Sequence, residues 1–139
     1  MQTTAPTLSS FNDFLAAARA QPDAQRLLFV FGVAELPPTH SPGQAIRFRE
    51  GRGGALSPVM CVDKAIGELA DFPALVAESR STGQPWDVVF AAALAAPAGR
   101  EPSEPEVEQA LRSMIGAVHR GAVERFLAFD AEGRSLLLS

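Results

Sequence analysis

The sequence predicts one α/β domain over residues 1–139, with a layered, mixed but mostly parallel sheet of about five strands and a C-terminal β-hairpin. Three observations support this fold class. The length of 139 residues is typical of a single domain. Apolar residues make up 47% and charged residues 20%, which suffices for a buried core. Helical and strand-like segments alternate along the chain, which favours a parallel sheet and leaves an α+β sandwich as the alternative.

The first helix is expected to begin at Ser9 or Ser10 and to end before Pro22. The Ser10 side chain can accept a hydrogen bond from the backbone N–H of Asp13, whose carboxylate suits the positive end of a helix dipole. The apolar residues that follow at helical spacing are Phe11, Phe14, Leu15 and Ala18. These signals predict an amphipathic helix with one buried face.

Two strands and a short helix come next. Residues 26–34 form an apolar run without alternation, which predicts a central strand buried on both faces and ended by the prolines at 37–38. Residues 41–50 carry the signals of a short helix. Residues 55–63 form the second strand, and Pro58 places this strand at a sheet edge or starts it after the proline.

A helix and a third strand make up the middle of the chain. Asp63 is a plausible cap for a helix over residues 64–80, which Pro73 kinks or splits. Residues 81–85 form a turn. The apolar run 86–94 then predicts a second strand buried on both faces.

The last helix has the clearest end signals in the chain. Ser103 and Glu106 form a capping box, and Gly121 ends the helix. Its apolar positions repeat at helical spacing and are Val107, Ala110, Leu111, Met114, Ile115 and Val118. Residues 126–129 and 134–138 then form the predicted hairpin.

Charge and residue usage exclude several classes of protein. Sixteen acidic residues against twelve basic ones give a net charge of −4, so we expect no nucleic-acid partner and no anionic membrane partner. A single cysteine excludes an internal disulfide framework and a cysteine-based zinc site. No spacing of metal ligands and no nucleotide motif occurs, so we expect no metal and no cofactor.

We expect the protein to be localised in the cytoplasm. The first basic side chain is Arg19, so the basic start of a signal peptide is missing. No stretch approaches the roughly 18 apolar residues that a membrane helix needs.

The candidate site follows from the predicted parallel sheet, because ligands bind outside the carboxyl ends of parallel strands. Glu35 and His40 follow the first strand, and Cys61, Asp63 and Lys64 close the second. In this interpretation Lys64 holds an anion and Glu35 or Asp63 acts as a base. The alternative is structural: Asp63 caps a helix, Lys64 is solvated and Glu35 ends a strand.

Cys61 has two interpretations of its own. Its place on a strand is typical of a small buried hydrophobe. A nucleophilic thiolate would instead need His40 or His119 nearby, and nothing in the sequence places either residue close to it.

Several segments carry a family resemblance that spans nearly the whole chain. They are residues 26–31 with 34–37, 53–56, 60–64, 85–90 and 126–130. Together they resemble a group of short proteobacterial proteins that are often labelled as a ribonucleotide reductase alpha subunit. A reductase alpha subunit is several times longer and uses several cysteines, whereas this chain has Cys61 alone, so no catalytic residue carries over.

Three hypotheses on function follow. The leading one is a non-enzymatic accessory or interaction protein that forms a homo-oligomer, with residues 134–138 as a sheet edge for pairing with another chain. The alternative is a small-molecule-binding protein or enzyme that uses the polar pocket at the carboxyl ends of the strands. The third, which the resemblance implies, is a partner of an enzyme such as a reductase.

Overall fold

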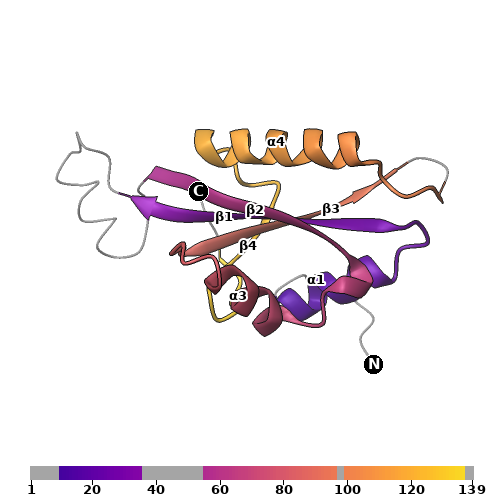
Figure 1. Ribbon diagram of the computed structural model, residues 1–139, viewed down its shortest axis with the longest axis horizontal. Helices are drawn as coiled ribbons and strands as arrows, with labels where there is room; N and C mark the ends of the chain where they lie inside the picture. Colours follow the sequence, from indigo (N-terminus) through magenta and orange to yellow (C-terminus); the bar gives the residue numbers. More distant parts are fainter. Residues whose placement is uncertain (1–9, 36–54, 97–98, 137–139) are drawn as a thin grey trace, which may run out of the picture.

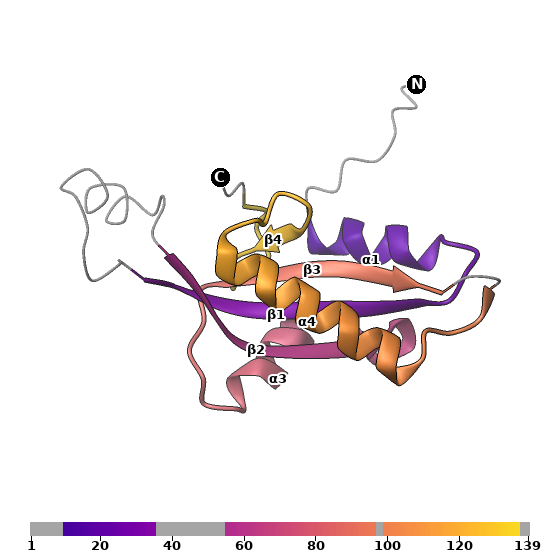
Figure 2. The same cartoon turned by 90° about the horizontal axis from the view of Figure 1, so that it is seen from above.

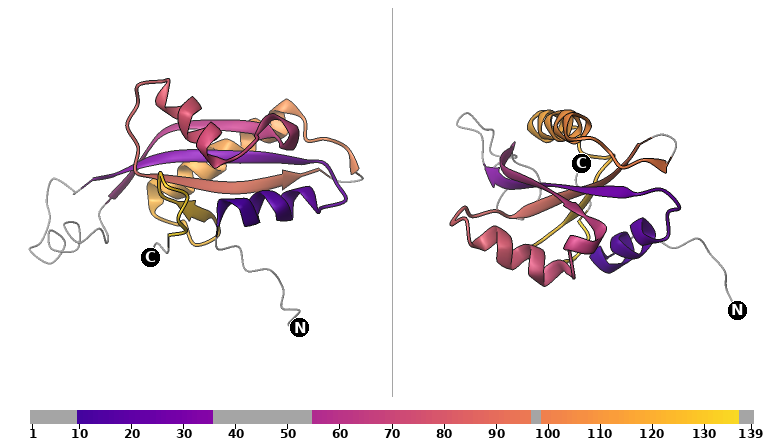
Figure 3. Two further views of the ribbon diagram at one scale, coloured as in Figure 1. Left: turned by 90° about the horizontal axis from the view of Figure 1, so that it is seen from below. Right: turned by 45° about the vertical axis from the view of Figure 1, so that its right-hand side comes forward.

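The computed structural model describes residues 10–35, 55–96 and 99–136, and these fold into three layers (Figure 1). The elements, in chain order, are α1 (Phe11–Arg19), β1 (Gln25–Glu35), β2 (Ala55–Ala65), the 3₁₀ turn η1 (Ile66–Glu68), α3 (Phe72–Arg80), β3 (Val88–Ala95), α4 (Glu104–Arg120) and β4 (Leu127–Phe129). A single four-stranded sheet forms the middle layer. α4 covers one face of this sheet, and α1 and α3 cover the other (Figure 3).

The sheet has the strand order β2-β1-β3-β4, and every neighbouring pair is antiparallel. The predicted α/β class with a mostly parallel sheet of about five strands is therefore wrong, and the fold class is α+β. The physical reason lies in β1. β2 and β3 do run in the same direction, with α3 as the crossover between them, but β1 lies between the two strands and pairs with both.

Burial of β1 on both faces confirms one prediction from the sequence. Residues 27–31 are all at most 3% exposed. Leu27, Phe29 and Phe31 pack in the cluster under α1 and α3, whereas Leu28 and Val30 pack in the cluster under α4. An apolar run without alternation is what a strand between two helical layers requires.

Aromatic rings fill the core between the sheet and the helices α1 and α3. The Phe11 ring lies 4.7 Å from the Phe72 ring and 5.5 Å from the Phe129 ring, measured between centroids. Phe11 belongs to α1, which begins where Ser10 Oγ accepts a hydrogen bond from the Asp13 N–H over 3.2 Å, as predicted. The cluster thus joins α1, α3 and β4 through ring contacts.

α4 has the predicted ends. Ser103 and Glu106 form the capping box, and Gly121 ends the helix in the left-handed conformation, with a φ of 76°. The buried positions Val107, Met114 and Val118 face the sheet. Figure 2 shows α4 crossing the sheet obliquely, with its first turns toward the end of β2 and its last turns toward β4.

The helix predicted over residues 64–80 divides differently. β2 continues to Ala65, η1 follows, and α3 begins only at Phe72. Asp71 caps α3 by accepting a hydrogen bond from the Ala74 N–H over 2.9 Å, so the predicted cap Asp63 is wrong. Pro73 lies in the first turn of α3, where a proline lacks no needed N–H.

The C-terminal hairpin forms in a short version. Phe129 of β4 bridges to Ser135, and the Leu136 N–H donates to the Ala128 carbonyl over 2.8 Å. Arg134 bridges on its other side to Ser10, directly before α1. The predicted helix over 41–50 and residues 137–138 of the predicted hairpin lie outside the described residues.

Candidate functional site

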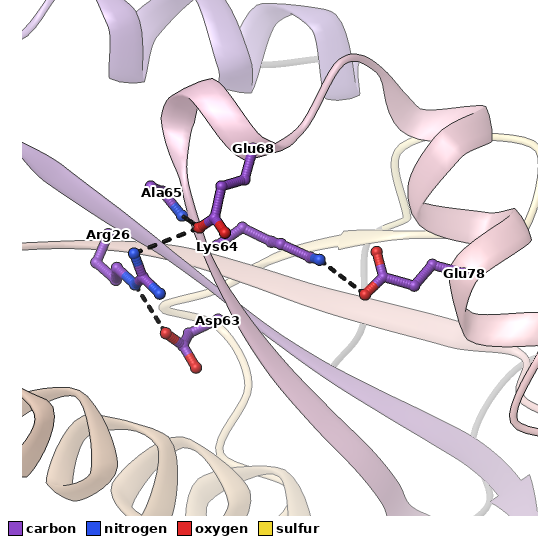
Figure 4. A network of polar contacts seen from close by, with 6 residues as sticks. All are labelled: Arg26, Asp63, Lys64, Ala65, Glu68 and Glu78. Atoms are coloured by element: carbon purple, nitrogen blue, oxygen red, sulfur yellow. Dashed lines mark hydrogen bonds and ion pairs between the residues drawn. The ribbon is translucent and has the colours of Figure 1, made fainter.

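The five residues of the predicted polar pocket do not share one site. Asp63 and Lys64 are neighbours on β2, so their side chains leave opposite faces of the sheet. Asp63 lies on the α4 face, where its carboxylate accepts a 2.7 Å hydrogen bond from Arg26 Nε. Lys64 lies on the other face, where its Nζ is 2.7 Å from the Glu78 carboxylate of α3 (Figure 4).

Glu35 also lies away from this pair. Glu35 ends β1 opposite Ala55, whereas Asp63 pairs with Leu28, seven positions earlier in β1. At roughly 3.3 Å per residue, that separation along the strand is about 23 Å. His40 lies outside the described residues. Antiparallel pairing removes the common carboxyl edge on which the predicted pocket depended.

Cys61 is exposed rather than buried. It belongs to β2 and pairs with Val30. Partial burial raises the pKa of the Cys61 thiol above its ordinary value, and the nearby Asp63 carboxylate raises it further. Such a thiol stays protonated at neutral pH, which is the opposite of what a nucleophilic cysteine needs.

The outer side of β2 is open as far as the described residues go. The strand order makes β2 an edge strand, and no other described segment pairs with it. The Ala65 N–H donates to Glu68 Oε1 over 2.6 Å, so the backbone of Ala65 faces away from β1. Orientation alternates along a regular antiparallel strand, and the register is unbroken from Met60 to Ala65. Cys61 and Asp63 therefore direct their N–H and C=O groups to the open side.

Local features at both ends of this open stretch prevent further backbone pairing with an added strand. Pro58 has no N–H, and the register shifts between Phe31 and Gly32, which lies opposite Pro58. At the other end, the Glu68 carboxylate already holds the Ala65 N–H. Prolines, bulges and covered amides are devices that limit pairing at sheet edges. The stretch left for pairing is centred on Val62, between Cys61 and Asp63.

A cavity of about 620 Å³ lies beside this stretch, between the end of β2, the start of β1 and the first half of α4. Most of the charged side chains around it are acidic. The cavity is lined by Ala24, Gln25, Arg26, Asp63, Ala65, Glu101, Pro102, Glu104, Val107, Glu108 and Leu111. Four carboxylates thus surround one guanidinium, which makes this end of the α4 face negative.

The charges of the cavity are unequally paired. Arg26 contacts Asp63 over 2.7 Å and Glu68 over 3.4 Å, and Glu108 contacts Arg112 within α4 over 2.8 Å. Glu101 and Glu104 form no ion pair with any of the residues that the structure describes. A cation that entered the cavity would meet these two carboxylates without displacing an existing ion pair.

Nothing in the sequence marks Arg26 and the α4 carboxylates as parts of one site. Glu104 carried a sequence signal only as a residue at the start of a helix, and Arg26 only as the start of a strand. Their meeting with Asp63 depends on the register of β1 against β2 and on the course of α4.

The described residues form neither a cluster of metal ligands nor a helix suited to a membrane. Within residues 10–35, 55–96 and 99–136, no group of three or more histidine, cysteine or acidic side chains is placed to hold a metal ion. No helix in the same ranges combines the length and apolarity needed to cross a membrane. Compared with protein-family models, curated proteins and solved structures, the chain matches none of them.

Proposed function

We propose that this protein is an interaction protein that binds another polypeptide by taking it up as an added strand along β2. The observation that carries the proposal is the open stretch at Cys61 and Asp63, whose outward backbone groups have no partner among the described residues. An extended peptide recognises such an edge through main-chain hydrogen bonds. The sheet then grows from four strands to five.

The energetics require side-chain contacts as well. The two residues offer four backbone groups, and a hydrogen bond contributes roughly 0.5–1.5 kcal/mol net. Association costs at least about 4 kcal/mol in lost freedom of motion. The backbone bonds alone therefore come close to cancelling that cost. A stable complex must add contacts on the faces of the sheet next to β2, where the cavity lies on the α4 side.

The sequence predicts self-association through residues 134–138. In the structure, β4 pairs with Ser135 and Ser10 bridges to Arg134, so the described part of that segment has neighbours on both sides. We therefore place the binding edge on β2 and leave the homo-oligomer as a prediction for sedimentation analysis. A cytoplasmic location belongs to the proposal too, because a reducing compartment keeps the exposed Cys61 thiol free.

The decisive experiment replaces single backbone donors with proline. Cys61→Pro removes an N–H that faces the open side, so we expect the fold to persist and partner binding to disappear. Cys61→Ser is the matched control, because it changes the thiol and keeps the N–H. The wild type and both variants are immobilised and incubated with extract from the native organism. The proteins that each one retains are then compared by mass spectrometry.

A protein retained by the wild type and by Cys61→Ser, but not by folded Cys61→Pro, supports the proposal. Equal retention by Cys61→Pro would overturn it. If a reductase subunit is among the proteins that Cys61→Pro fails to retain, this result would support the hypothesis of a reductase partner.

A second candidate function rests on the cavity alone. Its volume of about 620 Å³ lies in the range of small-molecule sites, and Arg26 and Asp63 provide polar groups in its wall. Native mass spectrometry of the purified protein tests this candidate. The candidate is supported if the wild-type protein carries the extra mass of a small molecule and the Arg26→Ala variant does not. It is contradicted if the protein shows only its own mass after incubation with an excess of metabolite extract.

A further inference from the structure

We propose that the strand added to β2 comes from an extended segment that alternates basic and aliphatic side chains and runs antiparallel to β2. This inference rests on the proposed function and names the chemistry of the partner. Two features of the structure carry it: the open backbone at Cys61 and Asp63, and the unequal charge on the two faces beside it.

The α4 face selects the basic side chains. In an antiparallel pair, side chains of directly opposite residues lie on the same face of the sheet. Partner residues opposite Cys61 and Asp63 therefore project on the α4 face, on the side of the cavity that Asp63 lines. There they meet the carboxylates of Glu101 and Glu104, which form no ion pair with any other described residue. Lysine or arginine at these two partner positions gains attraction, whereas aspartate or glutamate is repelled.

The opposite face selects the aliphatic side chain. The partner residue between the two basic ones lies across from Val62, on the face that α1 and α3 cover. Met60 and Val62 are only partly buried there, at the border of the aromatic core cluster. An aliphatic side chain placed across from Val62 would remove apolar surface of both residues from water. Lys64 is engaged with Glu78 on the same face, so a further basic side chain has no reason to lie there.

A second copy of β2 fits this surface poorly. Antiparallel pairing of two copies about Val62 places Asp63 of each chain opposite Cys61 of the other. Both Asp63 carboxylates then lie on the α4 face, next to the acidic cavities. Such a dimer brings two acidic cavities together on one face, each with the carboxylates of Glu101 and Glu104, unpaired among the described residues, and the favoured occupant is therefore a basic segment of another protein.

The test uses a fluorescein-labelled peptide with the sequence Gly-Arg-Val-Arg-Val-Arg-Gly and its counterpart with glutamate in place of arginine. Fluorescence anisotropy with the full-length protein measures binding. We expect the arginine peptide to bind and the glutamate peptide to bind at least about tenfold more weakly. Glu101→Gln combined with Glu104→Gln should lower the affinity for the arginine peptide by at least about fivefold.

The matched control for charge is Glu124→Gln combined with Glu132→Gln. It removes the same net charge at exposed positions outside the cavity, so it should change binding by less than about twofold. Equal weakening in the two double variants would show that only net charge matters, and would overturn the inference.

Methylated peptides test the register without changing the protein. Arginine residues opposite Cys61 and Asp63 direct their N–H groups to β2, and the valines between them direct theirs away. N-methylation of the arginine amides should therefore abolish binding, while N-methylation of the valine amides should leave it unchanged. The reverse pattern would overturn the antiparallel register.

The outcomes separate the two proposals. Arginine-peptide binding that is unaffected by Cys61→Pro and by both methylations would overturn the proposed function together with this inference. Loss of binding with Cys61→Pro, but equal binding of the glutamate peptide, would overturn only the basic partner. A third outcome is a wild-type dimer that the Cys61→Pro substitution dissociates and that neither peptide displaces. It would assign the β2 edge to a second copy of this chain and would also overturn the basic partner.

Discussion

The indole N–H of Trp86 donates a 2.8 Å hydrogen bond to Oγ of Ser79, and both side chains are buried. The Ser79 hydroxyl donates in turn to the Val76 carbonyl, so it acts as donor and acceptor at once. Ser79 belongs to α3, and Trp86 lies just before β3. This contact therefore fastens the crossover helix to the strand that it leads into, while Phe31 of β1 packs edge-on against the indole at 5.0 Å.

Replacing Ser79 by alanine should lower the free energy of unfolding by about 1–3 kcal/mol, because a buried indole N–H loses its acceptor. Urea denaturation followed by the fluorescence of Trp86, the only tryptophan, measures the loss. Ser81→Ala is the matched control, since Ser81 is exposed and its hydroxyl donates to the Glu78 carbonyl without accepting a bond from any buried group among the described residues. We expect a loss below about 0.5 kcal/mol there, and similar losses in both variants would contradict the role given to the Trp86 bond.

Gly133 allows a close approach in the turn after β4. Its φ is +82°, and a Cβ at this position would lie 3.2 Å from Cδ2 of Phe72. Gly133→Ala should therefore lower the free energy of unfolding by at least about 1–2 kcal/mol, from the left-handed backbone alone. Thermal or urea denaturation provides the measurement.

Gly83→Ala separates the two causes. Gly83 has a similar φ of +77°, but a Cβ there has no neighbour within 4 Å in the described part of the chain. The loss at Gly83 then reports backbone strain only, and the excess at Gly133 reports the contact with Phe72. An equal loss at both positions would rule out a contribution from that contact.

Glu106 should make stability depend on pH in acid. Arg100 donates hydrogen bonds of 2.7 and 2.9 Å to its carboxylate, and the Ser103 N–H donates another; together they lower the pKa of Glu106 from 4.5 to about 2. Because the pKa is lower in the folded protein, the stabilisation is present above about pH 4.5 and is lost as the pH falls toward 2.

Urea denaturation at a series of pH values checks this prediction. Glu106→Gln should be less stable than the wild type at pH 7, and the difference should shrink between about pH 4.5 and 2. Glu124→Gln, which removes one carboxylate at an exposed position, is the matched control. A constant gap between Glu106→Gln and the wild type would contradict the assigned contacts.

Amide exchange along β2 should alternate. The amides of Met60, Val62 and Lys64 face β1 and should exchange slowly, whereas those of Cys61 and Asp63 face the open side and should exchange quickly. Hydrogen–deuterium exchange read by NMR resolves individual amides. Uniform protection from Met60 to Lys64 would show that another segment covers this edge. Val62→Pro, which removes an inward donor, should unfold the strand where Cys61→Pro does not.

Local chemistry in the sequence was enough to predict most of the elements. The unbroken apolar run of β1 predicted burial on both faces, and Ser10, Ser103 and Gly121 predicted helix ends that the structure confirms. Each of these signals acts over a few residues, through one hydrogen bond or one backbone angle. They can therefore be recognised in the sequence without knowing which segments pack together. The sequence predicts Asp63 as a helix cap, but the same acceptor chemistry recurs at Asp71, where the helix begins.

Only the tertiary structure decided which strand lies beside which. The alternation of helix and strand is the same whether β1 lies outside β2 and β3 or between them, yet the choice makes the sheet parallel or antiparallel. The same choice separates Lys64 from Asp63 and brings Arg26, Asp63 and Glu104 around one cavity. Strand order depends on contacts between residues that are far apart in the chain, and those contacts leave no mark in the spacing of residues along it.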